Sequence, residues 1–172
     1  VGRKPDLQRP LHQENEVDLL LWRHADAEYG PPDLQRRLTD KGHRQAEAAA
    51  KWLSRHLPAD YQVWASEAAR SQQTAAYLER ELIIRPEINP ETDALVFPAL
   101  LAAIGDEQTV VITGHQPWLG AWCAYLLNGN WNAGFDWSVK KSGFWWFRYQ
   151  NTHGLAHAKL VAAMTPAVLL AD

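Results

Sequence analysis

The sequence predicts an α/β three-layer sandwich: a mostly parallel central sheet with helices on both faces and antiparallel strands near the C-terminus. Apolar runs of strand length alternate with segments of helical period, which is typical of a parallel sheet. The runs at 17–22 and 109–113 contain little polar alternation, so both of their faces should be covered. Apolar segments at 144–149 and 155–161 flank a turn-rich stretch and predict a late hairpin.

The first half of the chain begins with the strand at 17–22, followed by a glycine- and proline-bearing loop at 25–37. Thr39 is typical of an N-cap, and a helix over 40–57 follows with alanine and leucine along one face. Pro58 ends that helix.

The next unit is a strand at 61–65, with Ser66 as the expected cap of a helix over 67–81. A short strand is expected at 83–84. The run Asn89-Pro90-Glu91 combines a cap, a proline at the first helical position and an acid in the first turn, so it predicts a helix over 90–104.

A further helix is expected after the strand at 109–113, beginning at Pro117 and ending near Leu127. The lone Cys123 falls in this helix, cannot form an internal disulfide, and is expected to be a small buried hydrophobe. Trp145 and Trp146 should point to opposite faces of the late strand.

The length of 172 residues favours one domain over 17–172, preceded by a polar, loose extension over 1–16. A net charge of −3 gives no general attraction for nucleic acid or an anionic membrane. No apolar run reaches transmembrane length and no signal peptide is evident, so we expect a cytoplasmic location.

Polar residues gather where three of the predicted strands end. Arg23 and His24 follow the first strand, Arg70 lies in the first turn after the second, and His115 follows a later one. The carboxyl ends of parallel strands meet at one edge of a sheet, and Arg70 would lean back over that edge. One histidine could attack phosphorus, while two arginines and the other histidine hold the phosphoryl oxygens.

These residues resemble the motifs of the histidine phosphatase superfamily. Arg23-His24-Ala25 is similar to its Arg-His-Gly, and the segment from Ser66 to Thr74 matches its Ser-x-x-x-Arg-x-x-x-Thr. Gly114-His115 is similar to its later Gly-His, and the segment from Arg37 to Gly42 resembles its Leu-Thr-x-x-Gly helix start. The chain is short and has no inserted segment that would form a cap over the site, and in this it is most similar to the SixA-type phosphohistidine phosphatases.

The resemblance implies a phosphoglycerate mutase-like fold and a hydrolase that needs neither metal nor cofactor. It implies that His24 is the phosphorylated nucleophile and that Arg23, Arg70 and His115 are catalytic residues that bind the phosphoryl group. The expected partner is a phosphohistidine protein of a phosphorelay or phosphotransferase system. A small phosphoester substrate, a mutase reaction and a non-catalytic module that binds phosphoproteins are the alternatives.

The chain departs from the family pattern in two places. Ala25 replaces the usual glycine. An alanine would be strained if this residue needed a positive φ, and otherwise the replacement would cost little stability. We expect that residue 25 does not need a positive φ. A general acid is not evident, and the candidates are Glu87, Glu91 and Asp93. A phosphohistidine substrate would reduce the need for an acid, because imidazole is a better leaving group than an alkoxide.

Several residues near the motifs have plainer interpretations. Ser66 is expected to act as a helix cap and Thr74 as a packing residue. Trp118 could line the pocket rim or belong to the core. His43 and Glu47 share a helix face at metal-ligand spacing, but a solvated face explains them better.

Overall fold

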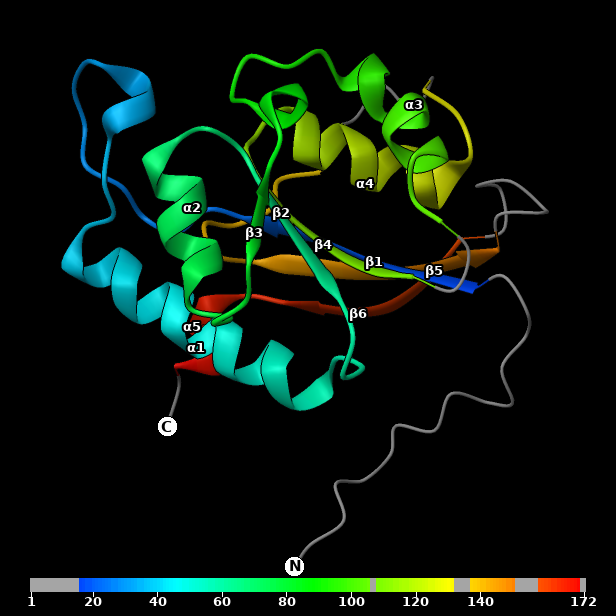
Figure 1. Ribbon diagram of the computed structural model, residues 1–172, viewed down its shortest axis with the longest axis horizontal. Coiled ribbons are helices and arrows are strands. Elements are labelled where there is room, and N and C mark those ends of the chain that lie inside the picture. Colours follow the sequence, from blue (N-terminus) through cyan, green and yellow to red (C-terminus); the bar gives the residue numbers. More distant parts are fainter. Residues whose placement is uncertain (1–15, 106–107, 132–136, 151–157, 171–172) are drawn as a thin grey trace, which may run out of the picture.

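A computed structural model of the protein describes residues 16–105, 108–131, 137–150 and 158–170. Figure 1 shows a single twisted sheet between two groups of helices. Its six strands run in the order β3-β2-β4-β1-β5-β6. They are β1 (Glu16–Arg23), β2 (Gln62–Ala65), β3 (Leu82–Ile84), β4 (Thr109–Gly114), β5 (Phe144–Gln150) and β6 (Lys159–Met164). The predicted fold class is confirmed.

The helices cover both faces of this sheet, with α1, α2 and α5 on one side and α3 and α4 on the other (Figure 1). None of those in the described segments is long and apolar enough to cross a membrane. They are α1 (Asp40–His56), α2 (Ala69–Ala76), α3 (Phe97–Ala102), α4 (Trp118–Asn128) and α5 (Pro166–Leu169), with short 3-10 turns η1 (Asp33–Gln35), η2 (Pro86–Ile88) and η3 (Ala94–Val96).

The strand register brings the expected strand ends to one edge. β1 and β4 are parallel, and Arg23 at the end of β1 lies opposite Gly114 at the end of β4. β2 is also parallel to β4, with Ala65 opposite Thr113. The residues that follow β1, β2 and β4 therefore leave the sheet side by side. In open parallel sheets, ligands bind at this edge, outside the carboxyl ends of the strands.

The core consists of two apolar layers, one on each face of the sheet. β1 contributes to both: Leu19 and Leu21 pack with the α3 and α4 side, and Leu20 and Trp22 pack with the α1 and α2 side. All four side chains are fully buried. This two-sided burial explains why the strand sequence lacks a polar alternation.

Helix α1 begins and ends close to the predicted positions. The side chain of Thr39 accepts a hydrogen bond from the backbone N–H of Gly42 at 3.0 Å, which confirms it as the N-cap. A Cβ at residue 42 would overlap the carbonyl oxygen of Asp26, so glycine is required for this close approach.

The expected helix over 90–104 is wrong. Two 3-10 turns precede a helix that begins only at Phe97, and the side chain of Asp93 caps the second turn by accepting from the N–H of Leu95. The carboxamide of Asn89, which the local pattern marked as a cap, instead bonds Glu67 in another loop. A tertiary contact therefore replaces the local capping interaction.

The expected helix over 67–81 is also too long. It begins at Ala69 and ends at Ala76, and its last turns tighten into 3-10 hydrogen bonds before Glu79 adopts a φ of 55°. That left-handed residue turns the chain toward β3.

The late hairpin has the predicted first strand but a displaced second one. The expected strand at 155–161 overlaps β6 only in part, and residues 151–157 lie outside the described segments. β6 continues to Met164, which pairs with Phe144 at the start of β5, and its first residue Lys159 pairs with Arg148. The expected extension over 1–16 also lies outside the described residues, apart from Glu16 in β1.

Two predictions for single side chains are confirmed. Trp145 packs toward one core layer and Trp146 toward the other, as alternation along a strand requires. Cys123 is buried in α4, and burial raises the pKa of its thiol.

Candidate active site

Two buried histidines meet where β1 and β4 end. The ring centroids of His24 and His115 are 5.1 Å apart, and the side chains are 7% and 1% exposed. The positive charges of Arg23 and Arg70 act on both rings and lower their pKa values. The structure therefore brings the four residues that the sequence singled out into one small space.

His24 has the form that a nitrogen nucleophile requires. Burial, followed by the charges of nearby arginines, lowers the pKa of His24 to about 3, so the imidazole is neutral at pH 7. Its Nδ1 lies 2.7 Å from the carbonyl oxygen of Ala25, which can only accept a hydrogen bond. Nδ1 consequently carries the proton, and Nε2 keeps the lone pair.

The contact of His115 with Ser66 is compatible with the opposite tautomer. Its Nε2 lies 2.7 Å from Oγ of Ser66, which also accepts a hydrogen bond from the N–H of Ala68. When the Ser66 hydroxyl donates to Nε2, the ring proton lies on Nδ1, which is buried without a partner among the described residues and is free to donate to a ligand. Burial and the neighbouring positive groups keep the pKa of His115 far below its ordinary value, so the ring is a neutral donor.

Ser66 therefore does more than the expected capping. It accepts one helix-start N–H, although the N-cap position itself is occupied by Ala68, and it orients His115. The Ser-x-x-x-Arg spacing was the available signal, because it places the serine at the same strand end as the arginine.

The two arginines are held by oxygen atoms of distant loops. Nη1 of Arg23 donates to the carbonyl of Val139 at 2.9 Å, and Nη1 of Arg70 donates to the carbonyl of Asp33 at 2.8 Å. Within the described segments, Nε of each arginine and Nδ1 of His115 are buried without a hydrogen-bond partner. Buried donors rarely stay unpaired, so this set is suited to an anion with several acceptor oxygens.

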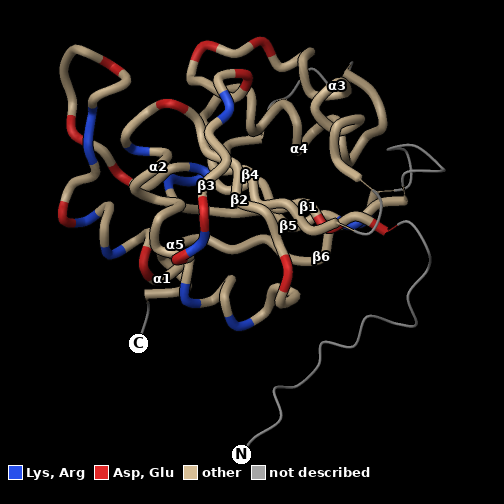
Figure 2. The backbone as a smooth tube through the Cα atoms, viewed as in Figure 1, with Lys and Arg blue, Asp and Glu red and all other residues tan. Residues whose placement is uncertain are grey.

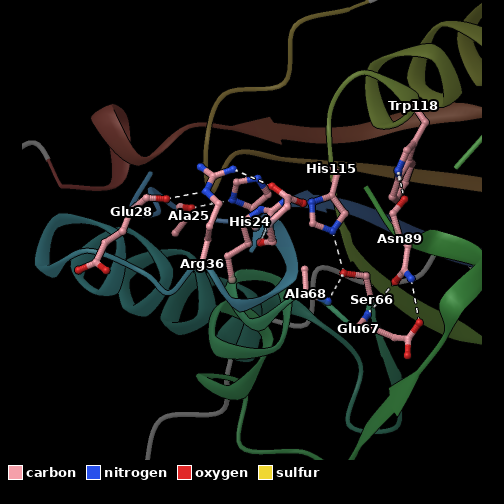
Figure 3. Close-up of polar contacts among 12 residues, drawn as sticks. His24, Ala25, Glu28, Arg36, Ser66, Glu67, Ala68, Asn89, His115 and Trp118 are labelled. Carbon is pink, nitrogen blue, oxygen red and sulfur yellow. Dashed lines mark hydrogen bonds and ion pairs between the residues drawn. The ribbon is translucent and has the colours of Figure 1, made fainter. Parts of the chain in front are cut away.

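Arg36 is a third guanidinium at the site, which sequence reasoning missed. Its positive charge acts on both histidines, and Figure 3 shows it beside His24 and Ala25. Its Nε donates to the carbonyl of Glu28 at 2.6 Å, which fixes the side chain along the loop before α1. The Arg36-Arg37 pair just before a capped helix was the only signal.

Ala25 and Thr74 connect β1 to α2. Ala25 is absent from the described non-glycine residues with positive φ, so it is not strained, as expected. Its N–H donates to Oγ1 of Thr74 at 3.0 Å, and that hydroxyl donates to the carbonyl of Arg70 at 2.7 Å. Thr74 is therefore a polar tie between the two motifs rather than a packing residue alone.

A loop before β5 supports the Arg-His pair from the other side. The N–H of Ser142 donates to the carbonyl of His24 at 3.1 Å, and the N–H of Arg23 donates to the carbonyl of Gly143 at 2.9 Å. Nζ of Lys141 lies 2.7 Å from Oδ1 of Asp26, and this hydrogen bond lowers the pKa of the carboxyl. No sequence pattern indicated this loop.

Trp118 belongs both to the core and to the site wall. It is 1% exposed, its ring is edge-on to His115 with centroids 6.2 Å apart, and its Nε1 donates to the carbonyl of Asn89. Figure 3 shows Asn89 between Trp118 and Glu67, linking the loops that follow β2 and β4.

No described contact joins the acid candidates Glu87 and Asp93 to the four site residues, and their role stays a prediction. Glu87 and Asp93 line a hollow of about 410 Å³ together with Arg85 and Leu100, and none of the four site residues lines it. Asp93 is engaged as a cap. The part of the chain that the structure describes contains no cluster of three or more His, Cys, Asp or Glu able to hold a metal ion, and His43 instead bonds the hydroxyl of Tyr77.

Known proteins resemble this chain in sequence and in structure. Residues 19–93 match the model of the histidine phosphatase superfamily (branch 1). An uncharacterized protein of Mycobacterium leprae is 34% identical over 116 residues, which cover 63% of this chain and 71% of that protein.

Solved structures share the whole architecture. The structure of a putative phosphohistidine phosphatase SixA from Nakamurella multipartitia has a TM-score of 0.74 and 28% identity, covering 88% of this chain and 96% of that one. The protein histidine phosphatase SixA complexed with tungstate also has a TM-score of 0.74, at 22% identity, covering 90% of this chain and 99% of that one. With its Arg-His pair, second arginine and second histidine at one sheet edge, the chain belongs to the histidine phosphatase superfamily.

Proposed function

We propose that the protein is a phosphatase that forms a covalent phosphohistidine on His24 and that its substrate is a phosphohistidine of another protein. The observation that carries the proposal is the set of three unpaired buried donors, Nε of Arg23, Nε of Arg70 and Nδ1 of His115, around a neutral histidine. They offer a phosphoryl group three N–H bonds and two positive charges.

In the first half of the reaction, Nε2 of His24 attacks phosphorus in line with the leaving group. The bond from phosphorus to the leaving atom breaks, and its electron pair departs with that atom. Arg23, Arg70 and His115 hold the equatorial oxygens and stabilise the charge of the transition state. In the second half, water attacks the phosphorus, phosphate leaves, and Nε2 of His24 regains its lone pair.

Two observations favour a nitrogen-linked phosphoryl group as substrate. The contacts of the described site residues include neither Glu87 nor Asp93, and their role as an acid stays a prediction. A phosphohistidine ring that is already protonated takes the electron pair of the P–N bond and departs as neutral imidazole without a general acid, whereas an alkoxide needs one. The likeness to a putative phosphohistidine phosphatase supports the same substrate class.

The test compares the wild type with His24→Ala on a phosphorylated histidine-containing protein and on 4-nitrophenyl phosphate, with and without a chelator. We expect turnover that survives the chelator, an acid-labile phosphoenzyme in the wild type, and neither in His24→Ala. His56→Gln is the matched control, because His56 stacks on Trp52 at the end of α1. Activity that survives His24→Ala, or that the chelator removes, would refute the proposal.

The alternatives are separated by adding phosphoglycerate as a substrate and a binding measurement with a phosphohistidine peptide. Turnover of phosphoglycerate between isomers would indicate a mutase. Turnover of phosphomonoesters alone would indicate a small-molecule phosphatase, and tight binding of a phosphohistidine peptide without turnover would indicate a binding module.

A further inference from the structure

The carboxylate of Asp33 joins two of the guanidiniums at the site. Its Oδ1 accepts from Nη1 of Arg36 and its Oδ2 accepts from Nη2 of Arg70, each at 3.1 Å. The backbone carbonyl of Asp33 separately accepts from Nη1 of Arg70. Figure 2 shows acidic and basic residues following one another along this segment between β1 and α1.

Exposure places Asp33 at the mouth of the site. The side chain of Arg70 is 4% exposed and His24 is 7% exposed, whereas the side chain of Asp33 is 55% exposed. In-line attack by the buried His24 puts the leaving group on the far side of the phosphorus, toward solvent. A leaving group that extends from the pocket therefore passes the end where this carboxylate lies.

The charge of Asp33 is retained near neutral pH. Partial burial acts against ionisation, but the hydrogen bonds and positive charges of Arg36 and Arg70 prevail and lower the pKa of the carboxyl. Asp33 is thus an anion at the mouth and is poorly suited to donate a proton to an alkoxide.

We propose that Asp33 is a specificity-determining residue that favours phosphoramidate substrates, in which phosphorus is bound to a protonated nitrogen group, over phosphate monoesters. This inference rests on the proposed function and adds the reason for the substrate class. Its basis is the placement of an exposed carboxylate on the two arginines at the entrance.

The chemistry of the two leaving groups differs in charge. A phosphohistidine ring protonated on its other nitrogen is cationic; when the P–N bond breaks, the electron pair moves to the ring nitrogen and neutral imidazole departs. The Asp33 carboxylate stabilises that cationic ring and keeps it protonated. A monoester releases an alkoxide or phenoxide, whose growing negative charge the same carboxylate repels.

A purely structural role for Asp33 predicts a different result. If the carboxylate only anchors Arg70, its loss weakens phosphoryl binding equally for every substrate. The backbone carbonyl of Asp33 still holds Nη1 of Arg70 in any side-chain variant, so the anchor is retained in part.

The experiment measures kcat/KM for the free amino acid phosphohistidine and for 4-nitrophenyl phosphate in the wild type, Asp33→Asn, Asp33→Glu and Asp60→Asn. We expect Asp33→Asn to lower the ratio of the two values by about tenfold. In the pH profile of Asp33→Asn on phosphohistidine, the fall in rate at alkaline pH should begin at a lower pH than in the wild type. The reason is that the substrate ring loses its proton more easily without the carboxylate. Asp33→Glu should keep most of the ratio, and Asp60→Asn, an exposed change before β2 at the opposite sheet edge, should keep all of it.

Each outcome has a defined meaning. An equal loss of kcat/KM on both substrates in Asp33→Asn would overturn this inference while leaving the proposed function intact. The same holds if the alkaline side of the pH profile on phosphohistidine is unchanged in that variant. A wild type that hydrolyses neither of these substrates nor a phosphorylated histidine-containing protein through His24 would overturn the proposed function and this inference with it.

Discussion

The hydroxyl of Ser66 lies 2.7 Å from Nε2 of His115 and holds that ring nitrogen in a hydrogen bond. The N–H of Ala68 already occupies one acceptor position of that oxygen. A serine proton donated to Nε2 leaves Nδ1–H of His115 for the phosphoryl group. In this arrangement the two histidines of the site hold opposite tautomers, and neither oxygen atom that they contact titrates near pH 7.

Ser66→Ala should lower kcat by about 10- to 100-fold, because His115 loses the group that fixes its tautomer and orientation. KM should change less, since both arginines stay in place. Steady-state kinetics on 4-nitrophenyl phosphate give this comparison.

Ser71→Ala provides the control for Ser66→Ala. Ser71 is also buried, and its hydroxyl donates to the carbonyl of Thr113 and accepts from the N–H of Ser66, but no described hydrogen bond joins it to His115. It should lose stability while keeping more activity than Ser66→Ala. An equal loss of kcat in both variants would show that Ser66 acts only through packing.

Acid should destabilise the protein through its two buried histidines. Both pKa values are lowered in the folded state, so the unfolded chain takes up protons first as the pH falls below 6.5. Between pH 6.5 and 5 the free energy of unfolding should fall by about 2 kcal/mol for each histidine. Urea unfolding at pH 7 and pH 5 measures this loss.

His115→Asn separates the histidine contribution from the rest of the titration. The variant should lose roughly half of the pH-dependent fall, because one buried imidazole remains at His24. An identical fall in the wild type and in His115→Asn would contradict the assignment of this pH dependence to His115.

The sequence predicted the sheet edge and its four residues because both depend on simple patterns. Because both faces of β1 and β4 are buried, these strands can be recognised in the sequence as continuous apolar runs. Their parallel pairing then places Arg23 opposite Gly114. The first strand and the Thr39 cap followed from the same local signals.

The missed features depend on contacts between distant segments. Asn89 has the local pattern of a helix cap, but its carboxamide bonds Glu67, 22 residues away, and the expected helix does not form. Likewise the carbonyl of Val139 that holds Arg23 is 116 residues away. A backbone acceptor has no residue type to recognise, so neither periodicity nor a motif could locate it.

Gly114→Ala should damage both the fold and the site. An added Cβ would overlap the six-membered ring of Trp118, which is fully enclosed and packs edge-on to His115. Overpacking of this kind costs about 1–3 kcal/mol, and the displaced ring should lower activity as well. Thermal melting and 4-nitrophenyl phosphate turnover report the two effects.

Gly105→Ala is the matched control, at the other end of β4. The nearest atoms to a Cβ there belong to the flexible side chain of Gln108, at 3.3 Å, which accepts a hydrogen bond from the N–H of Gly105. Its melting temperature and activity should stay close to those of the wild type. If Gly114→Ala behaved like Gly105→Ala, the close packing of Trp118 on β4 would be wrong.

Ala25→Gly, which restores the residue usual in the family motif, should reduce stability without improving catalysis. Ala25 is fully buried against Leu38 and Ala46 and does not require positive φ. Removing its methyl group and adding backbone freedom should cost about 1 kcal/mol. The backbone bonds of residue 25 to Thr74 and to His24 remain available, so kcat should stay within about threefold of the wild type. A gain in kcat of tenfold or more would instead show that the alanine strains the loop that carries His24.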